Sequence, residues 1–276
     1  MKLSVTTDYA RDTGDPSPYL RRIADAGFSH IHWCHHWCTD FMYSKSEIDQ
    51  IKRWLREYGL QVLDLHATAG HEKNWGSQRE YERLAGLELV RNRIAMASQL
   101  GSDVIILHAP VESTPDLFRR SLDELRPFAQ EHQVRIAVEN GDLNKIEKIL
   151  ADYDPDYLGL CYDSGHGNIA GDGLDGLERL KERLISVHLH DNDGATDQHN
   201  PLFSGTIDWP RLARLLACSA YARCVSMEIT MVNSGLEDEA AFLSHVFTTG
   251  TRFSRMIDAQ RKVVRKKTDT ESGKER

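Results

Sequence analysis

The sequence has few cysteines, no long apolar run and no sign of a targeting segment near its first residues. Its five cysteines are odd in number and spread from Cys34 to Cys224, which is typical of reduced thiols and not of a disulfide framework. No apolar stretch approaches the roughly 18 residues that a membrane-spanning helix requires. Residues 1–15 lack the basic start and apolar core of a signal peptide. We therefore expect a soluble, cytoplasmic protein with no membrane association.

Two common sequence fingerprints are also missing. Residues 34–38 read Cys-His-His-Trp-Cys, but no second Cys or His pair follows at zinc-finger spacing, so we predict no structural zinc there. The first apolar run is followed by Thr-Thr-Asp at residues 6–8 and not by a glycine-rich turn. An open, dinucleotide-binding sheet is therefore disfavoured.

Basic charge is scarce except near the last residue. The chain has 34 Lys and Arg against 42 Asp and Glu, a net charge of −8. Residues 261–276 hold seven basic and three acidic residues, so this tail carries +4 and the preceding body −12. An acidic body repels a phosphate backbone, so we expect no nucleic-acid partner. The tail has few apolar residues after Val264, and we expect residues 261–276 to be disordered.

What the sequence does contain is a regular alternation of short apolar runs and amphipathic stretches. Hydrophobic residues make up 40% of the 276 positions, enough for a large core. We predict strands at 2–7, 28–33, 60–65, 103–107, 134–138, 158–162, 184–189 and 223–227, and helices at 18–26, 45–58, 78–100, 115–132, 143–151, 174–183, 208–216 and 237–259. Eight such units without a linker predict an α/β fold, a single-domain (β/α)8 TIM barrel over residues 1–260.

Six consecutive predicted strands, from the third to the eighth, end in a histidine or an acidic residue. These strand-end residues are His66, His108, Glu139, Asp163, His188 with His190, and Glu228; His166 follows closely, and a loop adds Asp197 and His199. Strand interiors are rich in Val, Ile and Leu, so packing does not explain a polar residue at each last position. Because active sites of such barrels gather at the carboxyl ends of the strands, we predict that these side chains share one site.

This combination of side chains predicts a metal site. Two glutamates, an aspartate and a histidine around one axis repel one another strongly without a cation. Three carboxylates and one imidazole suit one divalent ion (Mn²⁺, Mg²⁺, Co²⁺ or Zn²⁺), with positions left for substrate oxygens. Such an ion would polarise a bound carbonyl as a Lewis acid.

The strand-end pattern resembles the xylose-isomerase-like barrel superfamily over residues 1–260. The motifs that carry the resemblance are Val-Glu139-Asn, Asp163-x-x-His166, His188-x-x-Asp191, Asp197-x-His199, Gly205-x-Ile-Asp-Trp209 and Glu228. The superfamily contains sugar and sugar-phosphate isomerases and epimerases, inosose dehydratases and endonuclease IV repair enzymes. The resemblance implies a TIM barrel with a metal held by Glu139, Asp163, His188 and Glu228. His190 stays open as the alternative to His188, because both point inward on a strand of period two.

The resemblance also implies a reaction. Glu139 and Glu228 would act as catalytic acid and base on opposite sides of a substrate carbon. We expect a divalent-metal-dependent sugar or sugar-phosphate isomerase or epimerase that transfers an α-proton through a metal-bound enediolate. The expected substrate-binding residues are His66, His108, His166, His199 and Trp75. The partner is a small sugar or polyol, and self-association into a homo-oligomer stays open.

Two other functions of this superfamily stay open. One is a metal-dependent carbohydrate dehydratase or hydrolase. The other is an endonuclease IV-like enzyme with three zinc ions, whose additional ligands would fall on His66, His108, His166, Asp197 and His199. The acidic body argues against DNA as substrate. The resemblance disfavours a free-ketose 3-epimerase, because residues 141–145 (Gly-Asp-Leu-Asn-Lys) and the loop at 197–199 lack a further glutamate and an arginine of those enzymes.

Overall fold

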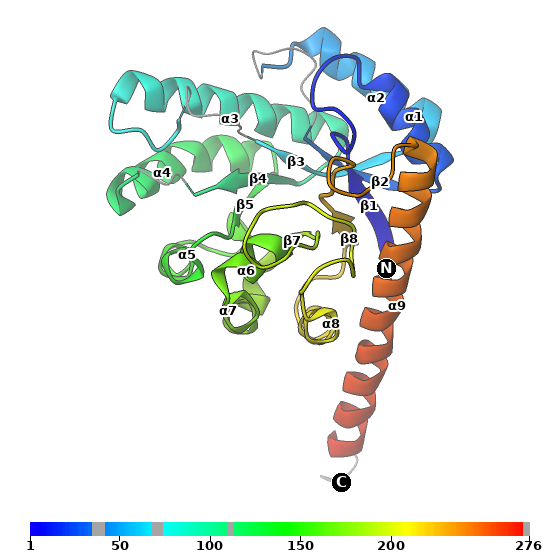
Figure 1. Ribbon diagram of the computed structural model, residues 1–276. Coiled ribbons are helices and arrows are strands. Elements are labelled where there is room, and N and C mark those ends of the chain that lie inside the picture. Colours follow the sequence, from blue (N-terminus) through cyan, green and yellow to red (C-terminus); the bar gives the residue numbers. More distant parts are fainter. Residues whose placement is uncertain (35–41, 68–73, 110–112, 273–276) are drawn as a thin grey trace.

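Eight parallel strands form a nearly closed barrel in the computed structural model (Figure 1). They are β1 (Lys2–Thr6), β2 (His30–Trp33), β3 (Gln61–His66), β4 (Val104–His108), β5 (Arg135–Glu139), β6 (Leu158–Asp163), β7 (Leu184–His188) and β8 (Cys224–Met227). Neighbours in the sheet are consecutive in sequence from β1 to β7, and β8 pairs with β1. The structure describes residues 1–34, 42–67, 74–109 and 113–272, with side chains to residue 265 in the last helix. The predicted (β/α)8 barrel is confirmed.

The barrel closes between β7 and β8 through a short seam. Leu189, directly after β7, forms an isolated parallel bridge with Met227 of β8. The Leu189 N–H donates to the carbonyl of Ser226 at 2.9 Å, and the Leu189 carbonyl accepts from the N–H of Glu228 at 3.2 Å. The seam therefore joins the chain immediately beside His188 and Glu228.

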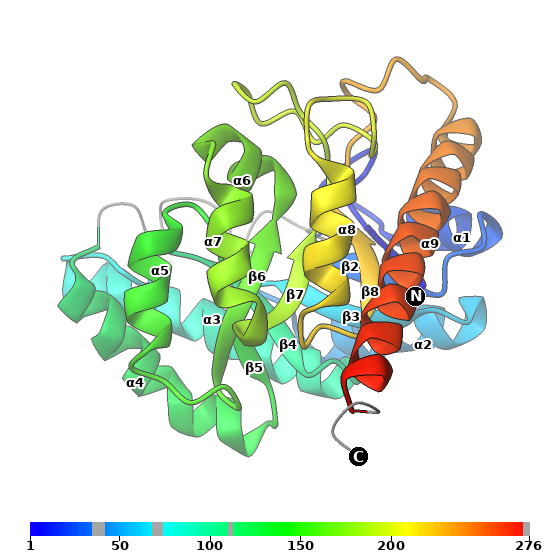
Figure 2. The same cartoon turned by 90° about the horizontal axis from the view of Figure 1, so that it is seen from below.

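The helices surround the barrel and cover the outer faces of its strands (Figures 1 and 2). They are α1 (Ser17–Asp25), α2 (Lys45–Tyr58), α3 (Glu80–Leu100), α4 (Pro115–Glu131), α5 (Leu143–Leu150), α6 (Ser164–Ala170), α7 (Gly173–Leu180), the 3₁₀ helix η1 (Lys181–Arg183), α8 (Trp209–Ala217) and α9 (Glu239–Ser272). No helix among the described residues is long and apolar enough to cross a lipid bilayer.

Local sequence signals explain where the helices begin and end. Helix α2 starts after Ser44, whose side chain accepts a hydrogen bond from the N–H of Glu47, while the Glu47 carboxylate accepts one from the N–H of Ser44. It ends at Gly59, whose φ of 69° is the left-handed conformation that favours glycine. Helix α6 is additional to the one helix that we expected after β6, because Asp163 caps a new helix at the strand's last residue.

Helix α9 is longer than expected. We predicted that it ends at residue 259, but its backbone stays helical to Ser272. The end of α9 lies away from the long loops that follow β7 and β8 (Figure 2). The helical backbone of residues 261–272 argues against the predicted disorder of this part of the tail. Residues 273–276 lie outside the described part of the chain, and their disorder stays a prediction.

The interior of the barrel is not uniformly apolar. Strands β4 to β7 contribute a separate buried apolar cluster of Val104, Ile106, Ala137, Cys161 and Ile185. Strands β1, β2, β3, β7 and β8 contribute buried polar side chains, namely Ser4, His32, Asp64, Ser186 and Ser226. The expectation of Val, Ile and Leu throughout the strand interiors is therefore corrected on this side of the barrel.

The long loop between β7 and α8, residues 189–208, is held by one buried carboxylate. Asp191 Oδ2 accepts a hydrogen bond from the indole N–H of Trp209 at 2.8 Å. Its Oδ1 accepts from the backbone N–H groups of Asn192 at 3.0 Å and Ile207 at 3.3 Å. Asp191 thus fixes both ends of the loop that carries Asp197 and His199.

We predict that Asp191→Ala lowers the free energy of unfolding by about 3 kcal/mol, because it leaves the buried indole N–H of Trp209 and two backbone N–H groups without their acceptor. Asp191→Asn is the matched control: it keeps one oxygen for the backbone donors, so its loss is smaller. Urea denaturation followed by tryptophan fluorescence measures both. Equal stability of Asp191→Ala and the native chain would contradict this role.

Candidate functional site

Four buried side chains converge at the carboxyl ends of adjacent strands. Glu139 ends β5, Asp163 ends β6, His188 ends β7, and Glu228 follows β8 directly. One ligand atom from each lies within 4.8 Å of the others. We call these residues the four-residue centre. The structure thus brings together the four predicted metal ligands.

The imidazole of His188 lies between the two glutamates. Its Nδ1 is 2.8 Å from Glu139 Oε1 and 2.9 Å from Glu228 Oε2. Burial raises the pKa of each glutamate, but the attraction of His188 outweighs it and holds both pKa values well below the ordinary value. Burial lowers the pKa of His188, yet its contacts with Cys161 and the glutamates raise it well above its usual value. A positive charge is therefore strongly favoured at this point.

The donor set of the four-residue centre fits a divalent cation. Its three carboxylates and one imidazole are all buried, so no bulk water screens their charges. Among the described residues, Glu139 Oε2 has no hydrogen-bond partner, although His108 Nε2 lies 2.9 Å away without hydrogen-bond geometry. A buried carboxylate oxygen without a donor is costly unless a cation occupies the space before it.

His66 and His108 extend the centre on the side of β3 and β4. Their Nε2 atoms lie 3.1 Å apart, and the His66 Nε2 is 3.5 Å from Glu139 Oε2. Burial lowers the pKa of His66, whereas the charge of Glu139 raises the pKa of His108. Both rings can donate to a ligand bound over Glu139, as the sequence predicts.

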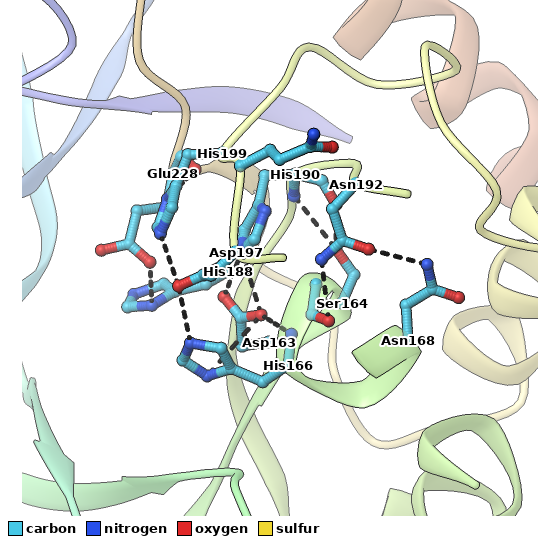
Figure 3. A network of polar contacts seen from close by, with 12 residues as sticks. Asp163, Ser164, His166, Asn168, His188, His190, Asn192, Asp197, His199 and Glu228 are labelled. Carbon is cyan, nitrogen blue, oxygen red and sulfur yellow. Dashed lines mark hydrogen bonds and ion pairs between the residues drawn. The ribbon is translucent and has the colours of Figure 1, made fainter. Parts of the chain in front are cut away.

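A second group of side chains surrounds Asp197 (Figure 3). The Asp197 Oδ2 atom is 3.3 Å from His166 Nε2 and 3.2 Å from His199 Nε2. Burial lowers the pKa of His166 and of His199, but the hydrogen bond to Asp197 and nearby carboxylates raise both to about 10. His190 stacks on His199 with ring centres 4.1 Å apart.

Backbone carbonyls fix how these two histidines point. The His166 Nδ1 lies 3.0 Å from the carbonyl of Asn140, and the His199 Nδ1 lies 2.9 Å from the carbonyl of Glu228. A carbonyl only accepts, so each Nδ1 carries its proton and each Nε2 faces Asp197. His166 and His199 therefore lie where we predicted substrate-binding residues.

The choice between His188 and His190 follows from these contacts. Both rings are buried and point into the barrel mouth, but only His188 contacts the two glutamates. His190 Nε2 lies 3.1 Å from both carboxylate oxygens of Asp163. His190 thus orients Asp163 from outside the four-residue centre.

Trp75 does not lie in the site. We expected it to form part of the substrate wall, but its side chain is only 2% exposed. Its ring packs against Phe118 of α4 with centres 4.8 Å apart, and its carbonyl accepts a hydrogen bond from Ser121. Burying this apolar ring in the core is more favourable than exposing it to water at the barrel mouth. Most of the Cys-His-His-Trp-Cys segment, residues 35–38, lies outside the described residues.

The family profile described as xylose isomerase-like TIM barrel matches residues 20–246. The chain belongs to this family. The resemblance inferred from the strand-end motifs is therefore confirmed.

Individual relatives are similar over most of the chain. The uncharacterized protein y4fM of Sinorhizobium fredii is 31% identical over 88% of this chain and 89% of its own length. The L-ribulose-5-phosphate 3-epimerase UlaE of Escherichia coli O157:H7 is 29% identical over 67% of this chain and 69% of its own. A solved D-tagatose 3-epimerase-like protein superposes with a TM-score of 0.76 at 22% identity, covering 94% and 99% of the two chains.

We predict that Gly165→Ala displaces His190 from Asp163. A Cβ at position 165 would lie 1.9 Å from His190 Cε1 and 2.6 Å from both ring nitrogens. The ring must move, at a cost of about 1–3 kcal/mol in the free energy of unfolding. Chemical denaturation and imidazole NMR signals measure the two effects.

The matched control is Gly141→Ala, because nothing lies within 4 Å of a Cβ there and the glycine needs no left-handed backbone. Unchanged His190 signals in Gly165→Ala would show that the ring is not confined by Gly165.

Proposed function

We propose that this chain is a divalent-metal-dependent enzyme that epimerises or isomerises a sugar or sugar phosphate. The observation that carries the proposal is the pair of buried glutamates, Glu139 and Glu228, both in contact with His188. The similarity to UlaE, whose name gives a sugar-phosphate epimerase, supports a substrate of this class. A dehydratase or hydrolase acting on a related carbohydrate is the alternative reaction at the same residues.

In this proposal Glu139, Asp163, His188 and Glu228 hold the divalent ion. When bound, such an ion withdraws electron density from a carbonyl and its neighbouring hydroxyl, which makes the hydrogen on the adjoining carbon more acidic. Manganese, magnesium, cobalt and zinc all suit a set of three carboxylates and one imidazole.

The two glutamates carry out the proton transfers. One glutamate, as the carboxylate, takes the α-proton of the substrate. The other, which must enter the step as the carboxylic acid, gives its proton to the opposite face of the resulting enediolate and so produces the epimer. Return of the first proton to the neighbouring carbon instead gives carbonyl migration. His166 is protonated at neutral pH, with a pKa of about 10, and its Nε2–H lies 3.3 Å from Asp197; on substrate binding this N–H would turn from Asp197 to a substrate oxygen.

We predict that Glu228→Gln and Glu139→Gln each lower turnover by at least about 100-fold, because an amide cannot accept the α-proton. The assay is proton exchange in deuterated water over ketoses, aldoses, their phosphates and inososes, which detects removal of the α-proton whichever product forms. Glu57→Gln, on the exposed surface of α2, is the control and retains full exchange. A Glu228→Gln variant with native turnover on the true substrate would exclude the proposal.

One observation favours a second candidate, an endonuclease IV-like enzyme with three metal ions. His66 and His108 face Glu139, and His166 and His199 face Asp197, so all the additional ligands expected for that enzyme lie around the same mouth. We propose nevertheless that these histidines and Asp197 hold no additional ion and that the four-residue centre holds one, because the body before residue 261 carries a net charge of −12 and the same histidines can donate to sugar hydroxyls.

Metal content separates the two candidates. We predict that His188→Ala loses the ion of the four-residue centre, whereas His66→Ala and His108→Ala retain it and mainly raise KM, because these two residues bind substrate and not metal. Elemental analysis of protein purified without chelators, with steady-state kinetics, measures both. Three ions per chain together with cleavage of abasic-site DNA would favour the nuclease.

A further inference from the structure

A buried histidine–aspartate pair lies inside the barrel beside His188 of the four-residue centre. His32 of β2 and Asp64 of β3 are both 0% exposed, and His32 Nδ1 is 2.8 Å from Asp64 Oδ1. Ser186 of β7 donates its hydroxyl to the other oxygen of Asp64. Burial raises the pKa of Asp64, but its bonds to His32 and Ser186 and the charge of His188 outweigh it and lower the pKa.

This pair fixes the tautomer of His32. An ionised carboxylate only accepts, so the proton sits on Nδ1 and a neutral ring leaves a lone pair on Nε2. Within the described part of the chain, Nε2 has no hydrogen-bond partner, and it lies 3.8 Å from Glu228 Oε1. A carboxylate that fixes one nitrogen while the other presents a lone pair is the arrangement in which histidine binds metals.

Cys34 lies beside this lone pair. It is two residues beyond His32 on the same face of the chain, and its backbone N–H donates to Thr7 Oγ1 at 3.1 Å. Ligand atoms of His32, Cys34 and Glu228 lie within 4.8 Å of one another. A metal-bound cysteine is a thiolate, so binding of a cation here would release the thiol proton.

Glu228 can serve two ions because its oxygens point to different neighbours. Oε2 lies 2.9 Å from His188, and Oε1 faces His32. We infer that His32 Nε2, Cys34 Sγ and Glu228 Oε1 form a second divalent-metal site that shares Glu228 with the four-residue centre. The thiolate and imidazole select zinc or cobalt over magnesium or calcium, and three protein ligands leave a position for a water or substrate oxygen.

The test is titration of the full chain with Co²⁺ alone. A cobalt–thiolate bond gives a sulfur-to-metal charge-transfer band in the near ultraviolet, which the four-residue centre has no sulfur ligand to produce. We expect this band in the native chain and its loss in Cys34→Ala, together with about one fewer bound cobalt per chain. His32→Ala is expected to weaken binding at this site at least tenfold while circular dichroism shows a folded barrel.

Cys161→Ala is the matched control, since the Cys161 thiol lies close to His188 but belongs to the apolar cluster. The band is expected to remain in Cys161→Ala. No band in the native chain, or a band that survives Cys34→Ala, would overturn the second site.

A further variant separates this inference from the proposed function, on which it does not rest. Asp163→Asn removes a carboxylate from the four-residue centre alone, so it is expected to lower cobalt binding there and to keep the thiolate band. Loss of the band in Asp163→Asn would show that the two ions bind only together and would overturn an independent site at Cys34.

Discussion

The concentration of buried negative charge at one end of the barrel is the constraint on which the rest of the site depends. Glu139, Asp163 and Glu228 are brought together by the register of parallel strands, and their repulsion must be balanced inside the protein. His188 provides part of that balance at Glu139 Oε1, and His108, 2.9 Å from Glu139 Oε2, provides another part. His166 and His199 each have Nδ1 committed to a backbone carbonyl, so Nε2 of each faces the carboxylate of Asp197.

Much of the fold and of the site follows from the sequence for a simple physical reason. A residue at the last position of a parallel strand lies at the barrel mouth regardless of the conformation of the loops. The positions of Glu139, Asp163 and His188 were therefore predictable from the strand ends alone. His166 and His199 were predictable because they stand in motifs that resemble those of the xylose-isomerase-like superfamily.

The parts that the sequence did not reveal depend on register and packing. His32, Asp64 and Ser186 lie within strands, and only the closing of the barrel brings β2, β3 and β7 to one point. The signal available was the alternation of His30, Ile31 and His32, which puts two histidines on one strand face. Trp75 was misplaced because a loop aromatic near a strand end is equally able to pack on a neighbouring helix.

The seam between β7 and β8 gives the site a role in the architecture itself. The two strands meet through the backbone of Leu189, and each supplies a side chain to the four-residue centre on either side of that point. A ligand held by both His188 and Glu228 is therefore also a cross-link across the last junction of the barrel. Anything that binds there more tightly in the closed ring than in an opened one must stabilise the closed ring by the same free energy. Ligand binding at the barrel mouth and closure of the barrel between β7 and β8 are therefore thermodynamically coupled.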